Sequence, residues 1–179
     1  GVGVDGVGPR KVRLENGKTI TAERVVLATH APILDRGAYF ARVEPMTSFV
    51  VSGRLSVPAP QGMYLSVDDP TRSISPLPGE EMGQGILVAG GGDRPGTAES
   101  NTAPALLRQF LRDRFEVASI ERSWGAHDQI SFDRLPLVGK LLPLDERVLV
   151  ATGFSKWGLA AGAGASEVLA DHVLGNDTE

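Results

Sequence analysis

The sequence predicts a mixed α and β fold in which an antiparallel sheet with one helix interrupts an α/β unit. Two runs of mostly apolar residues, 24–29 and 147–153, are typical of strands buried on both faces of a parallel sheet. Between them, short strand-like runs are separated by proline and glycine, as in an antiparallel sheet. Glycine (22) and proline (12) are together more frequent than usual, which argues against a helical bundle.

The composition excludes several kinds of site. The 179 residues include no cysteine, so this chain forms no disulfide, thiolate zinc site or iron–sulfur cluster of its own. Its three histidines are scattered without metal-ligand spacing, so we expect no metal. The net charge is −4 and no basic cluster predicts nucleic-acid binding. Because no signal-peptide pattern and no membrane-length apolar run is present, we expect a cytoplasmic protein with no membrane partner.

The N-terminal part predicts a hairpin followed by a buried strand. Residues 12–14 alternate between apolar and polar, Asn16-Gly17 is a strong turn signal, and 19–22 follow as the second strand. The run 24–29 then predicts a buried strand, and Pro32 ends the pattern.

The middle of the chain predicts an antiparallel sheet with one helix. The strand-like runs are 48–52, 63–67, 72–76 and 85–89. A helix is predicted over 104–115, with Asn101 or Thr102 as its cap and Pro104 in its first turn. Residues 120–124 predict a further strand. The apolar positions expected on one face of the helix are Leu106, Leu107, Phe110 and Leu111.

The C-terminal part returns to an α/β pattern. The strand 147–153 leads through a short turn into a helix predicted over Gly158–Leu174, with Gly175 as its C-cap. The first turns of this helix are nearly all glycine and alanine, and Gly162 and Ser166 repeat the small residue of Gly158 every four residues. The free N–H groups and the dipole of such a helix start favour a negatively charged group. Tight packing of the helix on the sheet is the alternative explanation.

This strand, turn and helix resemble those of a known family. Residues 151–158 (Ala-Thr-Gly-Phe-Ser-Lys-Trp-Gly) resemble the C-terminal flavin loop of the FAD-dependent amine and amino-acid oxidases, the glycine/D-amino-acid oxidase superfamily. Residues 133–139 are similar to its Asp-x-Leu-Pro-x-Ile/Val-Gly segment, and 25–32 to its strand ending in Ala-Thr-x-x-Pro. The similarity continues through 35–42 and 123–128, and it is greatest to a branch in which a Rieske iron–sulfur domain follows the oxidase.

The resemblance implies a partial FAD-binding Rossmann-like domain that is interrupted by a substrate-binding domain. Residues 1–44 and 129–179 would belong to the FAD domain, and 45–128 would form the mostly antiparallel substrate-binding sheet with one helix. Members of the family begin with a strand, G-x-G-x-x-G and a helix. Gly1-Val2-Gly3 and Gly90-Gly91-Gly92 lack that context.

We therefore expect a fragment that lacks the ADP-binding half of the FAD domain and the Rieske domain. FAD would be the cofactor of the parent protein and would be absent from this fragment, which would be inactive alone. The strands that should flank 25–28 and 148–151 are missing, so their exposed edges predict either self-association of the fragment or poor order in those flanks.

The resemblance also implies a flavin site at the turn before the last helix. Backbone N–H groups near Trp157, Gly158 and Leu159 would face the N1/O2 edge of the flavin, where negative charge builds up on reduction. A solvated Lys156 and a core Trp157 remain the alternatives for those two side chains. The cofactor-binding residues that the resemblance implies are Thr29, Gly153, Phe154, Lys156, Trp157, Gly158 and Leu159.

Two histidines are further candidates. His127 has the chemistry of a general base and is the candidate catalytic residue, with a surface histidine as the alternative. Asp128 follows it on a predicted strand end and would point to the opposite face, so the two are not expected to act as a couple. His30 ends a strand, and we expect it to have a capping role.

The implied activity is oxidation of a C–N bond in a small amine or amino-acid-like molecule by hydride transfer to flavin. The electrons would then pass to oxygen or to a Rieske cluster. Many relatives that oxidise amino acids place a lysine shortly after the flavin turn to hold the carboxylate, whereas residues 159–161 here are Leu-Ala-Ala, which leaves the substrate class open. The alternatives are a cofactor-free β-rich interaction module and a different flavoenzyme on the same fold.

Overall fold

The computed structural model describes most of the chain, namely residues 10–34, 36–77, 79 and 83–176. Gly1-Val2-Gly3, which were considered above as a dinucleotide motif, lie outside these residues, as does Asp35 at the start of the 35–42 match.

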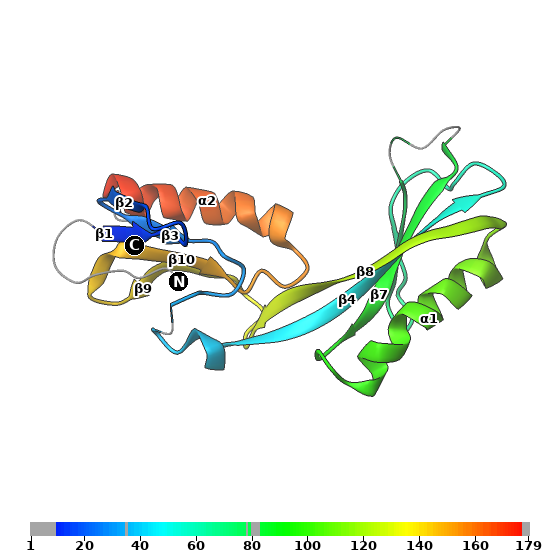
Figure 1. Ribbon diagram of the computed structural model, residues 1–179, viewed down its shortest axis with the longest axis horizontal. Helices are drawn as coiled ribbons and strands as arrows, with labels where there is room; N and C mark the ends of the chain where they lie inside the picture. Colours follow the sequence, from blue (N-terminus) through cyan, green and yellow to red (C-terminus); the bar gives the residue numbers. More distant parts are fainter. Residues whose placement is uncertain (1–9, 35, 78, 80–82, 177–179) are drawn as a thin grey trace. The chain divides into compact units, whose positions relative to one another are not determined.

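The chain divides into two compact units. Unit 1 combines both ends of the chain, 1–44 and 128–179, and unit 2 is the segment 45–127. Two long strands, β4 (Val43–Leu55) and β8 (Val117–Ser131), lie mostly in unit 2 and extend a few residues into unit 1 (Figure 1). The β-rich segment is therefore one continuous insertion, entered along β4 and left along β8.

Unit 1 opens with the predicted hairpin. Strands β1 (Arg10–Arg13) and β2 (Thr19–Ala22) pair antiparallel, with Arg13 opposite Thr19. Gly17 has a φ of +80°, the left-handed conformation that favours glycine, which explains why an Asn-Gly pair forms this turn. The hairpin prediction is confirmed.

A three-stranded sheet forms the centre of unit 1, in the order β3-β10-β9. Strand β10 (Asp145–Thr152) pairs parallel with β3 (Val25–Leu27) and antiparallel with β9 (Leu137–Leu142). Strand β10 is buried over 148–152, as predicted, whereas β3 is an edge strand of the described sheet whose Val26 is 41% exposed. The sequence did not predict β9, because Gly139 and Lys140 interrupt its apolar run.

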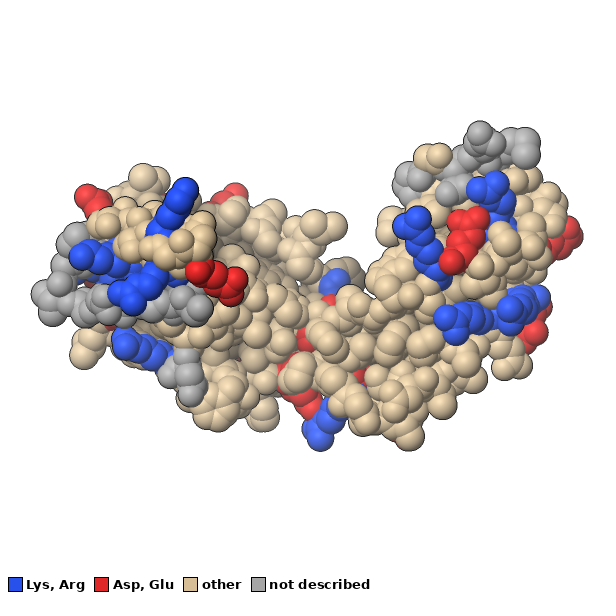
Figure 2. Space-filling view, viewed as in Figure 1, with Lys and Arg blue, Asp and Glu red and all other residues tan. Residues whose placement is uncertain are grey.

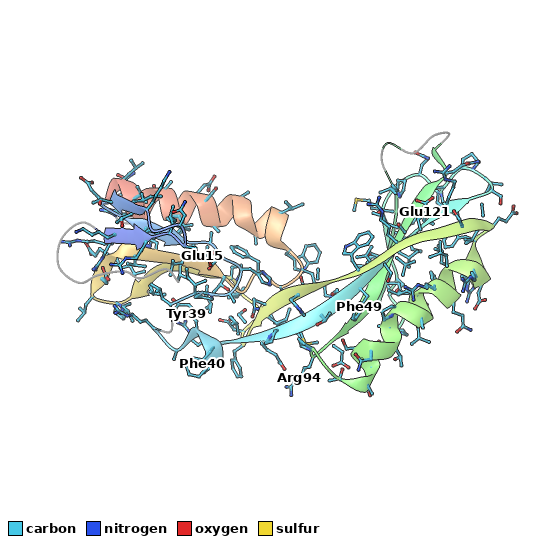
Figure 3. The ribbon with its side chains drawn as sticks, viewed as in Figure 1. Glu15, Tyr39, Phe40, Phe49, Arg94 and Glu121 are labelled. Carbon is cyan, nitrogen blue, oxygen red and sulfur yellow. The ribbon has the colours of Figure 1, made fainter. Side chains whose placement is uncertain are left out.

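Packing on the two faces of this sheet differs. Helix α2 (Gly158–Leu174) packs against β9 and β10 and ends at Gly175, whose φ of +76° confirms the predicted C-cap (Figure 1). Tyr39, from the short 3₁₀ helix η1 (Tyr39–Ala41), lies on the other face of the sheet (Figure 3). The core that Tyr39 joins consists of Leu27, Leu141, Val148 and Val150.

Unit 2 contains a five-stranded sheet in the order β5-β6-β7-β4-β8. Its shorter strands are β5 (Tyr64–Leu65), β6 (Arg72–Pro76) and β7 (Gly85–Asp93), and the pairs β5–β6, β6–β7 and β4–β7 are all antiparallel. The expected mostly antiparallel sheet is therefore confirmed. Strand β8 is much longer than the predicted run 120–124.

The triple glycine of β7 is a bulge. Thr47 pairs with Asp93, and Phe49 pairs with Gly90, so β7 has one residue more than β4 in this interval. Gly91 has a φ of +71°, and a Cβ there would lie 2.5 Å from the Cβ of Ala103 on the neighbouring helix. A close approach of sheet and helix, rather than a nucleotide, accounts for glycine at position 91.

Helix α1 (Ala98–Arg114) covers one face of the unit 2 sheet and begins earlier than predicted. Thr97 is its cap, since the Thr97 Oγ1 accepts a hydrogen bond from the Ser100 N–H at 3.2 Å, and Pro104 lies inside the helix. Leu107 and Leu111 are buried as expected, but Leu106 is 54% exposed because the buried stripe continues through Ala103 instead. The sheet residues in this core are Val51, Leu55, Ile86 and Val88.

Candidate functional site

The parallel pair of β3 and β10 brings two turns to one edge of the unit 1 sheet. Leu27 pairs with Val150, so both strands end at the same level. Thr29 and His30 follow β3, and Gly153 follows β10. Ligands of α/β sheets commonly bind at the carboxyl ends of the strands. We call residues 29–30 and 153–159 the strand-end site.

Hydroxyl groups tie the two turns together. The Thr152 Oγ1 donates a hydrogen bond to the His30 carbonyl oxygen at 2.5 Å, and Thr152 is only 1% exposed. Within the first turn, the Thr29 Oγ1 donates to the Ala31 carbonyl oxygen at 2.8 Å. The hydroxyls of these two threonines, rather than the expected His30 side chain, satisfy the carbonyl groups at the end of β3.

The turn after β10 is fixed to the end of β8. Gly153 has a φ of +73°, and a Cβ there would lie 3.2 Å from the Cβ of Ser131. Phe154 forms a single antiparallel bridge with Ile130, and the Ser155 N–H donates to the Gln129 carbonyl oxygen at 3.0 Å. Gly153 is buried, so the base of the turn is held rigidly before the helix begins.

Helix α2 starts with free backbone donors. Trp157 is the residue that precedes the helix, and its side chain makes no capping hydrogen bond. The first intrahelical hydrogen bond runs from the Ala161 N–H to the Trp157 carbonyl oxygen at 2.8 Å, so the N–H groups of residues 158–160 have no intrahelical acceptor. These donors and the helix dipole favour a negative group at this end.

The glycines of α2 face open space. A Cβ at Gly162 or Gly164 would meet no atom within 4 Å, and one at Gly158 would meet only Phe154, at the ordinary contact distance of 3.9 Å. Tight helix–sheet packing therefore does not explain Gly162 and Gly164. Small residues on an open face leave room for a group that this chain does not contain.

Most of the predicted cofactor-binding side chains at the strand-end site are exposed. Trp157 is 68% exposed and Leu159 is 99% exposed, so Trp157 is not a core residue of this chain. Lys156 and Thr29 are also exposed, whereas Phe154 is half-buried. Thr29 follows β3 and the other six predicted cofactor residues follow β10. Because the two strands end side by side, all seven lie at one edge of the unit 1 sheet.

His127 belongs to unit 2, near the end of β8. Its Nδ1 lies 2.9 Å from the Oγ1 of Thr47, which is only 5% exposed, and the rest of the imidazole is exposed. Phe49, labelled in Figure 3, occupies the space beside Gly125, where a Cβ would lie 3.1 Å from the ring. Thr47 thus gives His127 a partner that orients the ring.

Two ion pairs among the described residues of unit 1 lie at the other end of β10. The Arg10 guanidinium donates to the Asp145 carboxylate at 2.6 Å, and this hydrogen bond holds the pKa of Asp145 below its ordinary value. The nearby Lys140 ammonium lowers the pKa of Glu146 in the same way. These pairs hold the start of the central strand and are not part of the strand-end site.

The described residues carry no group of three or more His, Asp or Glu side chains that could hold a metal ion. No helix within the described ranges is long and apolar enough to cross a membrane. Lys and Arg atoms are interspersed with Asp and Glu atoms on the face shown in Figure 2.

The sequence alone did not reveal the residues whose contacts hold the two turns of the strand-end site. Thr152 was seen only as part of a family motif, and Gln129 and Ser131 of β8 were not considered. Their contacts join positions that are far apart in the chain, so no local pattern reveals them. The one available signal was the threonine at the end of each of the two apolar runs.

Comparisons with known proteins give a family match and a curated relative. The family model described as DAO, FAD dependent oxidoreductase, matches residues 1–172. A Bacillus subtilis (strain 168) protein named as the Rieske 2Fe-2S iron-sulfur protein YhfW is 31% identical over 158 residues, which is 86% of this chain and 30% of that protein.

Two solved structures show the same fold. Glycine oxidase from Geobacillus kaustophilus has a TM-score of 0.71 at 21% identity, over 95% of this chain and 46% of that one. Fructosyl amine:oxygen oxidoreductase (Amadoriase I) from Aspergillus fumigatus has a TM-score of 0.70 at 18% identity, over 98% of this chain and 45% of that one. The chain therefore spans less than half the length of each of these relatives.

Proposed function

The chain belongs to the DAO family of FAD-dependent oxidoreductases, and we propose that it supplies the flavin-ring side of an FAD domain together with a substrate-binding sheet. In this proposal residues 1–44 and 129–179 are parts of the FAD domain, and 45–128 form the substrate domain. The strand-end site carries the proposal, because it combines free helix donors with an open small-residue face.

The residues at the strand-end site are suited to the ring end of FAD. The N–H groups of residues 158–160 can donate to an electron-rich edge, and the absence of a Cβ at Gly158 and Gly162, four residues apart on one face of α2, leaves space for a large planar group. Thr29, Gly153, Phe154, Lys156, Trp157, Gly158 and Leu159 are the residues that we propose hold it. Bound FAD would supply the hydride acceptor.

The diphosphate end of FAD needs a different set of residues. A dinucleotide site uses a strand, a glycine-rich turn and a helix to bind the pyrophosphate. The described residues contain a single strand–turn–helix in unit 1, from β10 to α2, and it is the one assigned to the ring. We therefore propose that the other half lies in a part of the protein beyond this chain, and that this chain alone does not retain FAD.

The reaction that we propose is oxidation of a C–N bond to C=N in a small amine or amino-acid-like substrate. The substrate carbon loses a hydride and its nitrogen loses a proton. The exposed side of His127, oriented by Thr47, is our candidate to accept that proton. The free donors at the start of α2 stabilise the negative charge that the oxidation leaves on the acceptor.

The names of the relatives support this substrate class. One solved neighbour is named glycine oxidase and another fructosyl amine:oxygen oxidoreductase, and glycine and fructosyl amines both carry an amine nitrogen. The name of the Bacillus subtilis relative supports transfer of electrons to a Rieske cluster in the parent protein.

Reduction of the flavin by substrate tests the proposal. The full-length protein that contains this chain should purify with a flavin absorbance band, and an amine or amino acid should bleach the band without oxygen. A His127→Asn variant should bind FAD normally and bleach more slowly. Full-length protein that takes up no FAD would instead favour a cofactor-free interaction module.

A further inference from the structure

We propose that His30 is a cofactor-contact residue whose imidazole hydrogen-bonds an oxygen of bound FAD. This inference rests on the proposed function, because it concerns the same strand-end site. His30 lies at the carboxyl end of β3, beside the end of β10, where α/β sheets bind their ligands.

The backbone of His30 is in an uncommon conformation. Its φ is +64°, which places it in the left-handed region that is rare for residues with a side chain. Such conformations raise the energy by about 1–3 kcal/mol and persist where the surroundings fix them. Here the fixing contact is the hydrogen bond from the Thr152 Oγ1 to the His30 carbonyl oxygen.

The backbone geometry alone does not explain a histidine. Glycine adopts a positive φ without strain, and asparagine and aspartate adopt it as readily as histidine does. The carbonyl groups of this turn are satisfied by the hydroxyls of Thr29 and Thr152. The imidazole is exposed and has no hydrogen-bond or ion-pair partner among the described residues. The side chain is therefore available for a ligand at this edge.

A second strained residue lies at the same edge. Four residues other than glycine have a positive φ in the described chain: His30, Ala38, Arg134 and Ser155. Two of the four, His30 and Ser155, belong to the strand-end site, one in each turn. Backbone strain of this kind concentrates where a protein positions groups for binding. Ser155 lies in the second turn, and His30 lies exposed in the first.

The imidazole can meet one of two kinds of oxygen on FAD, a carbonyl of the ring system or a phosphate. Both accept a hydrogen bond from an imidazole N–H. Riboflavin contains the ring and lacks the phosphates, so comparison of FAD with riboflavin separates the two.

The experiment measures FAD and riboflavin binding to the full-length apoprotein by fluorescence quenching. His30→Gly keeps the backbone conformation and removes the side chain, and we expect it to weaken FAD binding about tenfold. His30→Asn keeps a short polar group, and its FAD affinity should lie between that of the wild type and that of His30→Gly. Ala38→Gly is the control, because it relieves the same kind of backbone strain at a residue outside the strand-end site, and it should bind FAD as the wild type does.

Each outcome decides the matter. Weaker binding of both flavins by His30→Gly, with a shifted midpoint potential, supports contact with the ring. Weaker binding of FAD alone supports contact with a phosphate. Unchanged FAD affinity and potential in His30→Gly would overturn the inference while the proposed function stands. A wild-type protein that binds no FAD would overturn both.

Discussion

The two helices of this chain have the same length, but they differ in how far the chain covers them. Helices α1 and α2 each contain 17 residues. Helix α1 buries Ser100, Ala103, Leu107 and Leu111 against its own sheet. Among the described residues of α2, only Ala165 is buried. Helix α2 nevertheless has the more apolar sequence, and a helix that is apolar on all sides is normally buried. We infer that α2 is built to be covered by something that this chain lacks.

This difference separates a unit whose helix is covered from a unit whose helix is largely exposed. Unit 2 contains both layers of its core, since α1 closes one face of the five-stranded sheet. Unit 1 leaves apolar side chains of α2 in solvent, including Leu159 at 99% and Leu174 at 73% exposure. Stability is therefore expected to depend on α1 and cofactor binding on α2, and the following predictions test that division.

The largest effect is expected in the core under α1. Leu111 is fully buried, so Leu111→Ala should lower the free energy of unfolding by about 2–5 kcal/mol. Leu159→Ala, on the exposed start of α2, is the matched control and should change it by less than about 0.5 kcal/mol. Chemical denaturation of the 179-residue chain measures both. Equal losses would contradict the contrast between the helices.

The next effect is expected at the start of β10. Asp145→Asn removes the charged partner of Arg10, whose side chain is 9% exposed, and should lower the free energy of unfolding by about 2 kcal/mol. The folded-state pKa of Asp145 is lowered, so its contribution is present above the unfolded-state pKa and is lost as the pH falls through the folded-state pKa. Denaturation as a function of pH should therefore show a smaller acid dependence in Asp145→Asn.

An exposed pair in the same unit is the control for this prediction. Glu146→Gln breaks the contact with Lys140, but Glu146 is 69% exposed, so its effect on stability should be clearly smaller than that of Asp145→Asn. A larger effect at Glu146 would show that burial does not determine the strength of these pairs.

A smaller effect of opposite sign is expected on the open face of α2. Gly162→Ala meets no atom within 4 Å and should stabilise the 179-residue chain by about 0.5–1 kcal/mol, because glycine weakens a helix interior. In the full-length protein the same methyl group should weaken FAD binding. Denaturation of the chain and FAD titration of the full-length protein give the two values. Stronger or unchanged FAD binding would show that this face is not covered when the cofactor binds.

The smallest effect concerns association of the 179-residue chain. Strand β3 is an edge strand with Val26 41% exposed, so light scattering should detect weak self-association. Val26→Lys should reduce it, since a charge on an edge strand opposes strand pairing. A wild-type chain that stays monomeric at every concentration would contradict the prediction.

Local signals predicted much of this fold. Asn16-Gly17 gave the hairpin, Gly175 gave the end of α2, and the apolar run before Gly153 gave the central strand, because each depends on residues close in the chain. The predicted start of α1 was wrong. Proline favours the first turn of a helix, so Pro104 pointed to a start there, whereas a single threonine such as Thr97 is a weaker sequence signal for a helix start.

The candidate site was predictable only in part. The family resemblance identified the turn at 153–159, and the structure gives it the free helix donors expected there. The support from Thr152, Gln129 and Ser131 depends on contacts between β10, β3 and β8, which sequence periodicity does not describe. The positive φ of His30 accompanies the hydrogen bond from Thr152 to its carbonyl oxygen, a contact between positions far apart in the chain, so no sequence pattern predicts it.

The ratio of bound FAD to protein, measured on the 179-residue chain and on the full-length protein after the same treatment with FAD, tests the proposed division of the cofactor site most directly. We predict one FAD for each full-length protein and almost none on the 179-residue chain. Stoichiometric flavin on the 179-residue chain would contradict the proposal that the diphosphate end of FAD is bound elsewhere, and no flavin on either form would contradict the flavin site itself.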